Sequence, residues 1–470
     1  MLFSSLSFVM FFLPINILAT RVLNIKSQNI FLLITSLLFY AWGEPVYVIL
    51  MLFSITFNWK MGIFIDKSKN NAAKKYMYTA IAITVNLALL FYYKYFNFFI
   101  AMISKVLPID TSSVAQIALP LGISFYTFQS ISYIIDLYRG TCQVQKSWIN
   151  VSLYISFFPQ LVAGPIIKYN DVNEALSNRT ITDEYTVYGI KRFVYGLGKK
   201  VILSNYFAYM VDQIYGLSIE HISMPLAWLG AVLYALQIYF DFGGYSDMAI
   251  GISSMFGFHF PENFNYPYVS TSVQEFWRRW HISLSTWFKE YLYIPLGGNR
   301  KGKYRTYINL LIVFFATGLW HGASWQFVVW GLFHGMFLII ERIFLGKYLK
   351  NPKIKPLAMI YTLVEVIIGF VIFRAPGMRY AIKYIIKMFI PLRSSGVYPV
   401  ARFINAKLVV FMAAGIILCG FLQEKFPKVK QYVYSTEIHK MEMLWLSVIY
   451  GICIINLISS SYNPFIYFRF

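Results

Sequence analysis

Residues 307–340 read YINLLIVFFATGLWHGASWQFVVWGLFHGMFLII, an apolar stretch with a histidine, His321, at a glycine-flanked break near its middle. If the basic residues on both sides of the stretch face the cytoplasm, as the positive-inside rule states, the stretch is a hairpin whose tip carries His321. These flanking residues are Arg300, Lys301, Lys303 and Arg305 before the stretch and Lys347, Lys350, Lys353 and Lys355 after it.

The depth of His321 follows from helix geometry. A helix from Tyr307 to Leu319 rises about 20 Å, at roughly 1.5 Å per residue, whereas the hydrocarbon core of a bilayer is about 30 Å thick. We therefore expect His321 to lie inside the membrane profile, where an ionisable group is costly and points to function. Desolvation disfavours the charged imidazole, so the neutral form is able to accept a proton. We predict a general base, which suits the transfer of an acyl group to a hydroxyl.

The composition of the whole chain indicates a membrane protein. Apolar residues make up 58% of the 470 residues and charged residues only 13%, a balance that soluble domains with a polar surface do not have. We predict an all-α polytopic protein with about ten to twelve membrane-embedded helices, some too short to span alone, in one domain over residues 1–470. Residues 1–21 lack a basic start and a small-residue cleavage site, so we expect a retained first helix.

The net charge of +21 is gathered in short hydrophilic loops, at residues 66–75, 299–305 and 425–430. We interpret these loops first as cytoplasmic, with an attraction to anionic lipids. A second interpretation makes the loop that contains Arg300, Lys301, Lys303 and Arg305 a docking place for a phosphate-rich acyl donor. Nucleic acid is not expected, because the basic residues flank spans and do not follow one face. The three cysteines show no metal-binding spacing.

A second informative stretch, residues 261–299, reads PENFNYPYVSTSVQEFWRRWHISLSTWFKEYLYIPLGGN. Its aromatic residues recur at helical spacing, with charged residues on the opposite side. We therefore predict an amphipathic helix that lies at the membrane interface or lines the inside of the bundle. His281 falls on the apolar face of that helix. It is either a functional residue or a packed histidine that bonds to a neighbouring carbonyl group.

Two further stretches carry polar groups in apolar surroundings. In residues 234–258, Asp241 and Asp247 flank a Gly-Gly pair that allows close packing or breaks the helix. These carboxylates are either structural partners of buried arginines, such as Arg278 and Arg279, or catalytic groups. In residues 119–140 several polar side chains either line a passage or hold helices together. They include Ser124, Tyr126 and Gln129.

Other catalytic signatures are missing from the sequence. There is no GxSxG turn, no HExxH motif and no GxxxxGK[ST] loop, which disfavours a serine nucleophile, a zinc protease and a P-loop enzyme. No two histidines fall at the spacing of three or four residues that zinc sites on a helix use, and we expect no metal.

Three segments together resemble the membrane-bound O-acyltransferase superfamily, and the branch that contains alginate O-acetyltransferase in particular. The segments are YFDFGGYSDMAIG at 239–251, EFWRRWHISLSTWF at 275–288 and GLWHGASWQFVVWGLFHG at 318–335. The hallmark of the superfamily is a histidine in an intramembrane WHG-like turn, with a second His or Asn upstream. The resemblance implies that His321 is the essential histidine and His281 its upstream partner.

The resemblance also implies an architecture and a reaction. It implies a ring of helices around a central tunnel, in the inner membrane of a bacterial cell. Acetyl would come from a cytoplasmic donor, acetyl-CoA, with no bound cofactor, and would pass outward, often through a separate SGNH-type transferase, to a cell-surface polysaccharide of unknown identity. The residues that we expect to line the tunnel or to bind the donor are Trp320, Trp280, Arg278, Arg279, Asp241, Asp247, Ser124, Tyr126 and Gln129.

Two alternatives stay open at this point. The teichoic acid D-alanyl transferase branch shares the RRWH-like and WHG-like elements, but its chains usually end sooner after the hairpin. The long segment after Ile340 argues against it. A polysaccharide flippase or ion-coupled transporter would also explain carboxylates within a helical bundle, but it would not need the two histidines.

Overall fold

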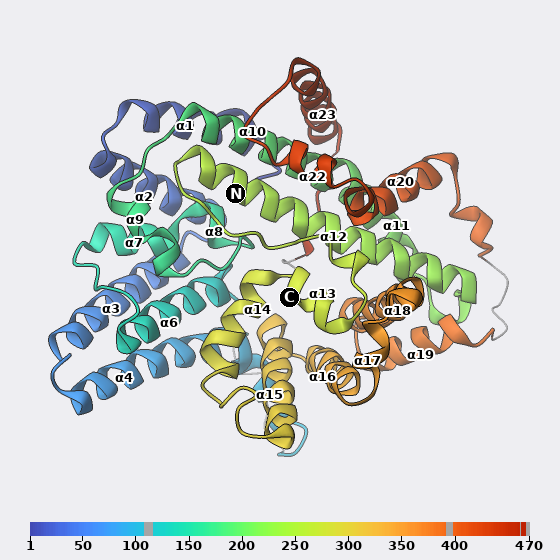
Figure 1. Ribbon diagram of the computed structural model, residues 1–470, viewed down its shortest axis with the longest axis horizontal. Coiled ribbons are helices and arrows are strands. Elements are labelled where there is room, and N and C mark those ends of the chain that lie inside the picture. The colour runs from blue at the N-terminus through green and yellow to red at the C-terminus, as the bar shows by residue number, and fades with distance from the viewer. Residues whose placement is uncertain (108–115, 392–397, 461, 467–470) are drawn as a thin grey trace. The chain divides into compact units, whose positions relative to one another are not determined.

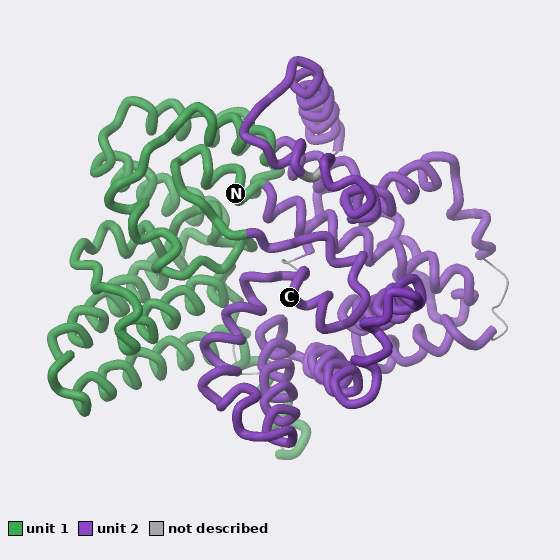
Figure 2. The backbone as a smooth tube through the Cα atoms, in the orientation of Figure 1, with its two compact units in different colours: residues 1–193, 248–261 green, residues 194–247, 262–470 purple. Residues whose placement is uncertain are grey.

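The computed structural model describes residues 1–107, 116–391, 398–460 and 462–466, and these residues form helices with no strand among them (Figure 1). The predicted all-α class is therefore confirmed. Contacts divide the chain into two compact units (Figure 2). Unit 1 comprises residues 1–193 and 248–261, and unit 2 comprises residues 194–247 and 262–470. The single domain over residues 1–470 stays a prediction.

Unit 1 is built from the first nine helices and the beginning of the tenth. Side-chain amides of α3 and α4 pair across the helices, because Asn58 and Asn86 each donate to the other's oxygen, at 3.1 and 2.7 Å. Buried amides without such partners would destabilise an apolar interface. The helices are α1 (Leu13–Val22), α2 (Ile25–Ala41), α3 (Tyr47–Lys67), α4 (Ala72–Leu90), α5 (Phe96–Ile103), α6 (Ile123–Arg139), α7 (Trp148–Ser156), α8 (Phe158–Leu161), α9 (Tyr169–Ser177) and α10 (Asp183–Gly198).

Unit 2 contains the rest of the described helices, including most of α12, which continues into unit 1. They are α11 (Asn205–Tyr215), α12 (Met224–Met255), α13 (Val273–Arg279), α14 (Ile282–Phe288), α15 (Lys303–His321), α16 (Trp325–Ile340), α17 (Gly346–Leu349), α18 (Lys355–Arg374), α19 (Met378–Phe389), α20 (Ala406–Ile416), α21 (Leu422–Lys425), α22 (Pro427–Val433) and α23 (Lys440–Ser459). Short π-helical turns, η3 (Lys199–Ser204), η6 (Lys289–Tyr293) and η7 (Glu341–Leu345), extend α10, α14 and α16.

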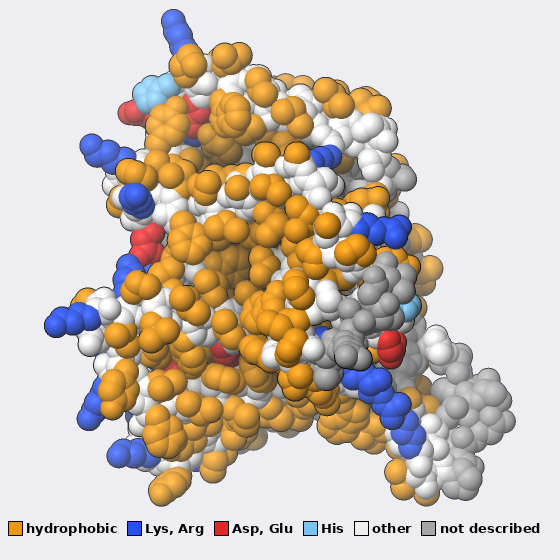
Figure 3. All heavy atoms as spheres, turned by 90° about the vertical axis from the view of Figure 1, so that its right-hand side faces the viewer, with side chains coloured by type: hydrophobic (Ala, Val, Ile, Leu, Met, Phe, Trp, Pro, Cys, Tyr) orange, Lys and Arg blue, Asp and Glu red, His pale blue; other side chains and the backbone are white. Residues whose placement is uncertain are grey.

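Seven of the described helices are long and apolar enough to cross a membrane. Shorter apolar helices accompany them at the N-terminus, at residues 8–22 and 25–41. Figure 3 shows a face on which hydrophobic side chains predominate and Lys and Arg side chains gather mainly along one margin. Such an apolar surface fits lipid as the solvent, and the chain is a multi-pass membrane protein. The seven spans are Tyr47–Lys67, Ala72–Ile103, Met224–Met255, Trp325–Leu349, Pro352–Arg374, Ala406–Lys425 and Lys440–Ser459.

The hairpin predicted around His321 is present as α15 and α16, which pack side by side (Figure 1). Two glycines let the helices approach closely. A Cβ atom on Gly318 would lie 2.3 Å from the Phe327 carbonyl oxygen, and one on Gly331 would lie 2.1 Å from the Phe314 carbonyl oxygen. No other residue fits these positions without moving the backbone.

Candidate active site

His321 is the last residue of α15, at the tip of the hairpin. Gly322 follows in an extended conformation, with φ −168° and ψ 153°, which ends the helix, and α16 begins at Trp325. The start of α16 is held by Gln326, whose Nε2 donates to the carbonyl oxygens of Phe373 and Ala375 at 3.2 and 2.6 Å. The predicted position of His321 at a break between two helices is confirmed.

Aromatic side chains surround the His321 imidazole. Its centroid lies 4.9 Å from that of Trp320, 5.0 Å from that of Trp330 and 5.2 Å from that of Phe373. The three ring pairs are close to perpendicular, an arrangement that packs an aromatic edge against a ring face. The imidazole is therefore held in one orientation in a largely apolar environment.

His281 lies at a break that the sequence pattern did not predict. The amphipathic helix expected over residues 261–299 is interrupted: α13 ends at Arg279 and α14 starts at Ile282. His281 adopts a left-handed conformation, with φ 43° and ψ 54°, which is rare for a residue other than glycine. The assignment of His281 to the apolar face of a continuous helix was thus wrong. Strained backbone of this kind is concentrated at functional sites.

The break is stabilised by Asn263, which lies on the loop before α13. The Asn263 carbonyl oxygen accepts from the Ile282 N–H at 2.9 Å, and its side-chain Oδ1 accepts from the Ser283 hydroxyl at 2.9 Å. The side-chain Nδ2 of Asn263 donates to Ser246 Oγ on α12 at 3.0 Å. One buried amide therefore ties the turn at His281 to α12.

Asn263 also determines which nitrogen of His281 carries the proton. His281 Nδ1 lies 3.1 Å from Asn263 Oδ1, and an amide oxygen only accepts hydrogen bonds, so Nδ1 is the protonated nitrogen. His281 is 1% exposed, and burial lowers its pKa to about 3. The ring is therefore neutral at physiological pH, with the lone pair on Nε2.

The two predicted histidines share one neighbour. The Trp320 ring centroid lies 5.9 Å from that of His281 and 4.9 Å from that of His321. Phe242 of α12 packs against His281 from another side, with centroids 4.7 Å apart. Trp280 does not join this group, since it stacks on Phe276, at 5.4 Å between centroids, as part of the surrounding apolar core.

A pocket of about 1170 Å³ opens beside the hairpin. Its lining includes the last turn of α16, from Leu338, and α15 from Leu310 to Thr317, which lies one helical turn before His321. Its inner wall includes Trp277, whose ring packs against Trp330 with centroids 5.8 Å apart, and Trp330 contacts His321. Two aromatic side chains, Trp277 and Trp330, thus separate the pocket from the imidazole, and neither His321 nor His281 lines it.

Basic side chains predominate among the charged residues that line the pocket. The lining contains six basic residues and three acidic ones, Glu275, Glu341 and Glu424. The four basic residues of the predicted docking loop, 300–305, are not among the lining residues, although Asn299 is. The six basic residues are Arg278, Arg279, Arg342, Lys347, Lys350 and Lys355.

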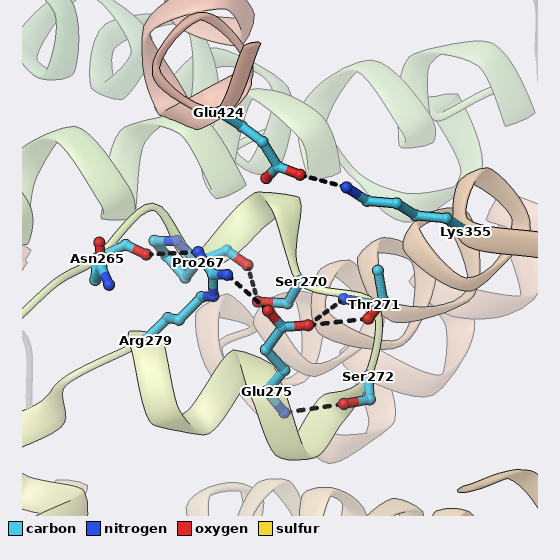
Figure 4. Close-up of polar contacts among 9 residues, drawn as sticks. All are labelled: Asn265, Pro267, Ser270, Thr271, Ser272, Glu275, Arg279, Lys355 and Glu424. Carbon is cyan, nitrogen blue, oxygen red and sulfur yellow. Dashed lines mark hydrogen bonds and ion pairs between the residues drawn. The ribbon is translucent and has the colours of Figure 1, made fainter. Parts of the chain in front are cut away.

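Ion pairs organise part of the pocket lining (Figure 4). Arg279 Nη2 lies 2.7 Å from Glu275 Oε1, and Lys355 Nζ lies 2.5 Å from Glu424 Oε1. Burial alone would raise the pKa of Glu275, but hydrogen bonds from the Thr271 N–H and hydroxyl and the Arg279 pair leave it below its usual value. Glu275 is therefore a carboxylate that fixes Arg279 and the start of α13.

The two carboxylates of α12 pair with lysines, and not with Arg278 or Arg279, which corrects the pairing expected from the sequence. Asp241 lies 2.5 Å from Lys200 Nζ, and Asp247 lies 2.5 Å from Lys199 Nζ. Asp241 also accepts from the Ile466 N–H at 2.8 Å. These carboxylates anchor η3 and the segment before the C-terminus to α12, because a buried charge must be paired. Helix α12 runs unbroken past its Gly-Gly pair.

Ser124, Tyr126 and Gln129 are buried on α6 in unit 1. Ser124 Oγ accepts from Lys94 Nζ at 3.1 Å. A role for these three residues in a polar passage stays a prediction. In the described part of the chain, His, Cys, Asp and Glu side chains form no group of three or more that could hold a metal ion.

Three buried polar features near the site were missed in the sequence. Asn263 is one, and the pair of His334 and Glu365, 2.8 Å apart and each 1% exposed, is another. Glu341 is the third: it accepts from two backbone N–H groups at the start of α13. A polar residue within an apolar run, such as His334 in GLFHG, is the signal that could have drawn attention to the second feature.

Known proteins resemble this chain over most of its length. The protein named probable alginate O-acetylase AlgI of Pseudomonas putida is 35% identical, with 100% of both chains covered. The peptidoglycan O-acetyltransferase of Helicobacter pylori is 34% identical over 82% of this chain and 79% of its own length. The teichoic acid D-alanyltransferase of Bacillus subtilis is 30% identical over 54% of this chain and 68% of its own length.

Residues 143–381 match the MBOAT, membrane-bound O-acyltransferase family. The matched range contains both histidines, the α15–α16 hairpin and nearly all of the pocket lining. The chain is therefore a member of the membrane-bound O-acyltransferase family.

Proposed function

We propose that this O-acyltransferase takes acetyl from acetyl-CoA on the cytoplasmic side and delivers it for the O-acetylation of an extracytoplasmic polysaccharide. The observation that carries the proposal is the basic pocket that leads to the hairpin of His321. Part of its lining comes from Asn299 and from residues 342–355, on the side that the positive-inside rule places in the cytoplasm.

The pocket chemistry fits a coenzyme A thioester. Among the described residues, Arg278, Arg342, Lys347 and Lys350 line the pocket without the carboxylate partners that Arg279 and Lys355 have in Figure 4, and so they suit phosphate groups. Aromatic residues at the inner end suit an apolar arm that carries the acyl group. The buried Trp277 indole N–H has no hydrogen-bond partner within the described part of the chain, and it is available to the bound substrate.

In the proposed reaction His321 is the general base. It takes the proton of an acceptor hydroxyl while the hydroxyl oxygen attacks the thioester carbonyl. The carbon–sulfur bond then breaks, the acyl group stays on the oxygen, and the thiolate of coenzyme A takes the proton from the imidazolium. The aromatic residues around His321 keep water away and thereby limit hydrolysis of the thioester.

His281 assists in this proposal as a neutral imidazole of fixed tautomer. Its Nδ1 is occupied by Asn263, so we assign its part in the reaction to Nε2. This nitrogen would accept a hydrogen bond from a group of the substrate, a hydroxyl for example, and so orient that group. Stabilisation of a thioester carbonyl would need a protonated Nε2, which this tautomer lacks, so we do not assign that role to His281.

The acceptor side of the proposal rests on the relatives. The names of two of them contain alginate and peptidoglycan, both polysaccharides outside the cytoplasm. We propose an inner-membrane location and a separate SGNH-type transferase as the partner that modifies the polymer. A D-alanyl transferase is less well supported, because that relative matches only 54% of this chain.

The test uses the protein reconstituted in liposomes with radiolabelled acetyl-CoA on one side and, on the other, an SGNH-type transferase with an oligosaccharide. The proposal predicts that label reaches the oligosaccharide with the wild type and not with His321→Ala. Polysaccharide movement without transfer of label would contradict the proposal and indicate a transporter. Transfer of D-alanine but not of acetyl would contradict the choice of donor.

A further inference from the structure

Glu341 connects the hairpin of His321 to α13, the helix that ends just before His281. It follows α16, one arm of the His321 hairpin, and is 5% exposed. Its Oε1 accepts from the Val273 N–H at 2.6 Å and its Oε2 accepts from the Gln274 N–H at 3.1 Å. Both donors belong to the first turn of α13, where backbone N–H groups have no partner within the helix.

The other end of α13 leads directly to His281. Trp280 N–H donates to the Phe276 carbonyl oxygen at 2.8 Å and closes the helix, and His281 follows in its left-handed conformation. The short helix is thus held at its start by the hairpin that carries His321 and ends at the other histidine. A displacement at its start moves the turn at His281.

The start of α13 also has a cap from its own sequence, the side chain of Ser272. Ser272 Oγ accepts from the Glu275 N–H at 3.0 Å, and this bond stabilises the helix without reaching another segment. The bonds to Glu341 join residues 68 and 67 positions apart in the sequence. Ser272 therefore contributes to the helix alone, whereas Glu341 also fixes the placement of the helix on the hairpin.

We infer that Glu341 is a positioning residue for acyl transfer, which holds α13 on the hairpin so that His281 stays in register with His321. The inference rests on the proposed function, since it assumes that both histidines act in the reaction. A misplacement of about 1 Å is able to cost about 100-fold in rate. The carboxylate acts at a distance from the reacting atoms, although it also lines the pocket proposed for the donor.

Glu341→Gln tests this role with a small change in shape. Glutamine has one acceptor oxygen, so one of the two bonds is lost together with the charge. We expect kcat to fall about tenfold, with a smaller change in the KM for acetyl-CoA, because most of the pocket wall is unaffected. Ser272→Ala is the matched control, and it should lower kcat less than Glu341→Gln does.

A variant on the other side of the contact makes the test independent of Glu341. Val273→Pro removes the N–H that donates at 2.6 Å, and proline suits the first position of a helix after the extended Ser272. It should lower kcat like Glu341→Gln, and the double variant should lose little more than either one. Val273→Ala keeps the N–H but loses buried volume, and it should retain most of the activity.

The deciding measurement is kcat for Glu341→Gln in the wild-type and in the His281→Ala background. A residue that acts through His281 should lower kcat about tenfold in the first background and less than twofold in the second. Equal losses in both backgrounds, or no loss in the wild type, would overturn the inference. If the wild type itself transfers no acetyl, the proposed function fails, a result distinct from an active Glu341→Gln.

Discussion

The two histidine segments differ in what determines their structure. The hairpin of His321 is shaped by neighbours in the sequence: an apolar run, a glycine after the histidine, and close contacts between helices that are adjacent along the chain. The turn of His281 is shaped from a distance, by Asn263 and by α12. A turn that local pattern determines is visible in the sequence, whereas one that remote contacts determine is not.

The largest effect should come from the locally determined segment. His321→Ala should lower acetyl transfer by about 10²- to 10⁴-fold, the usual loss for a general base, while the protein still inserts and folds. Initial rates with radiolabelled acetyl-CoA measure the effect, and size-exclusion chromatography in detergent reports on folding. His221→Ala, at a histidine outside the site, is the control and should keep its rate. Near-wild-type transfer by His321→Ala would remove this residue from the mechanism.

A smaller effect should come from the remotely determined segment. Asn263→Ala removes the acceptor that holds His281 Nδ1–H, and a lost buried hydrogen bond costs about 1–3 kcal/mol. If the whole of this free energy is lost from the stabilisation of the transition state, kcat falls by roughly 5- to 150-fold.

Asn263→Asp keeps an acceptor oxygen at this position and should retain more activity than Asn263→Ala, as rate measurements on the two variants would show. The same pattern should hold at the histidine, where His281→Asn tolerates the left-handed backbone and should retain more activity than His281→Ala. Equal rates for Asn263→Ala and the wild type would make the turn at His281 a packing feature only.

The buried state of His281 predicts a pH-dependent stability. Its pKa is about 3 in the folded protein, because of burial, against about 6.5 for an unfolded histidine. Between pH 6.5 and pH 3 this histidine is protonated in the unfolded chain but not in the folded protein. The free energy of unfolding therefore falls as the pH drops from 6.5 toward 3. At pH 5 the cost is about 2 kcal/mol.

Unfolding free energies in detergent at pH 7 and pH 5 measure this difference. His281→Asn should lose less stability over that interval than the wild type does, and His221→Asn should behave like the wild type. A wild type and a His281→Asn variant with the same pH dependence would contradict the buried neutral imidazole.

The smallest effect concerns the pocket. Arg342→Ala and Lys347→Ala should each raise the KM for acetyl-CoA about two- to fivefold, because exposed ion pairs contribute modestly. Their effect on kcat should be small, and high salt should reduce the difference from the wild type.

Neutralising Arg300, Lys301, Lys303 and Arg305 together is the comparison, since these residues do not line the pocket. Orientation in the membrane must be verified first by labelling single cysteines from each side, because these residues also direct topology. A larger rise in KM for this variant than for the pocket variants would place donor docking on the loop.

The helical class and the hairpin of His321 were predictable from the sequence, because hydrophobic pattern and glycine placement are local signals, whereas His281 was chosen from the family resemblance. The break at His281 was not, since Trp277, Trp280 and Leu284 fit one continuous helix as well as two short ones. The carboxylates of α12 were expected to pair with arginines of a neighbouring stretch, whereas their partners are Lys200 and Lys199. Partners across distant segments depend on the tertiary structure, which periodicity does not encode.

In the proposed mechanism one part of the molecule binds the donor and another performs the chemistry, and one measurement tests this separation directly. Binding of acetyl-CoA to purified protein is measured by calorimetry, alongside acetyl transfer, for the wild type, His321→Ala and the double variant Arg342→Ala/Lys347→Ala. We expect His321→Ala to bind acetyl-CoA like the wild type but to transfer no acetyl, and the double variant to bind weakly but to transfer at a near-normal kcat. Loss of binding in His321→Ala with unchanged binding in the double variant would contradict the proposed separation.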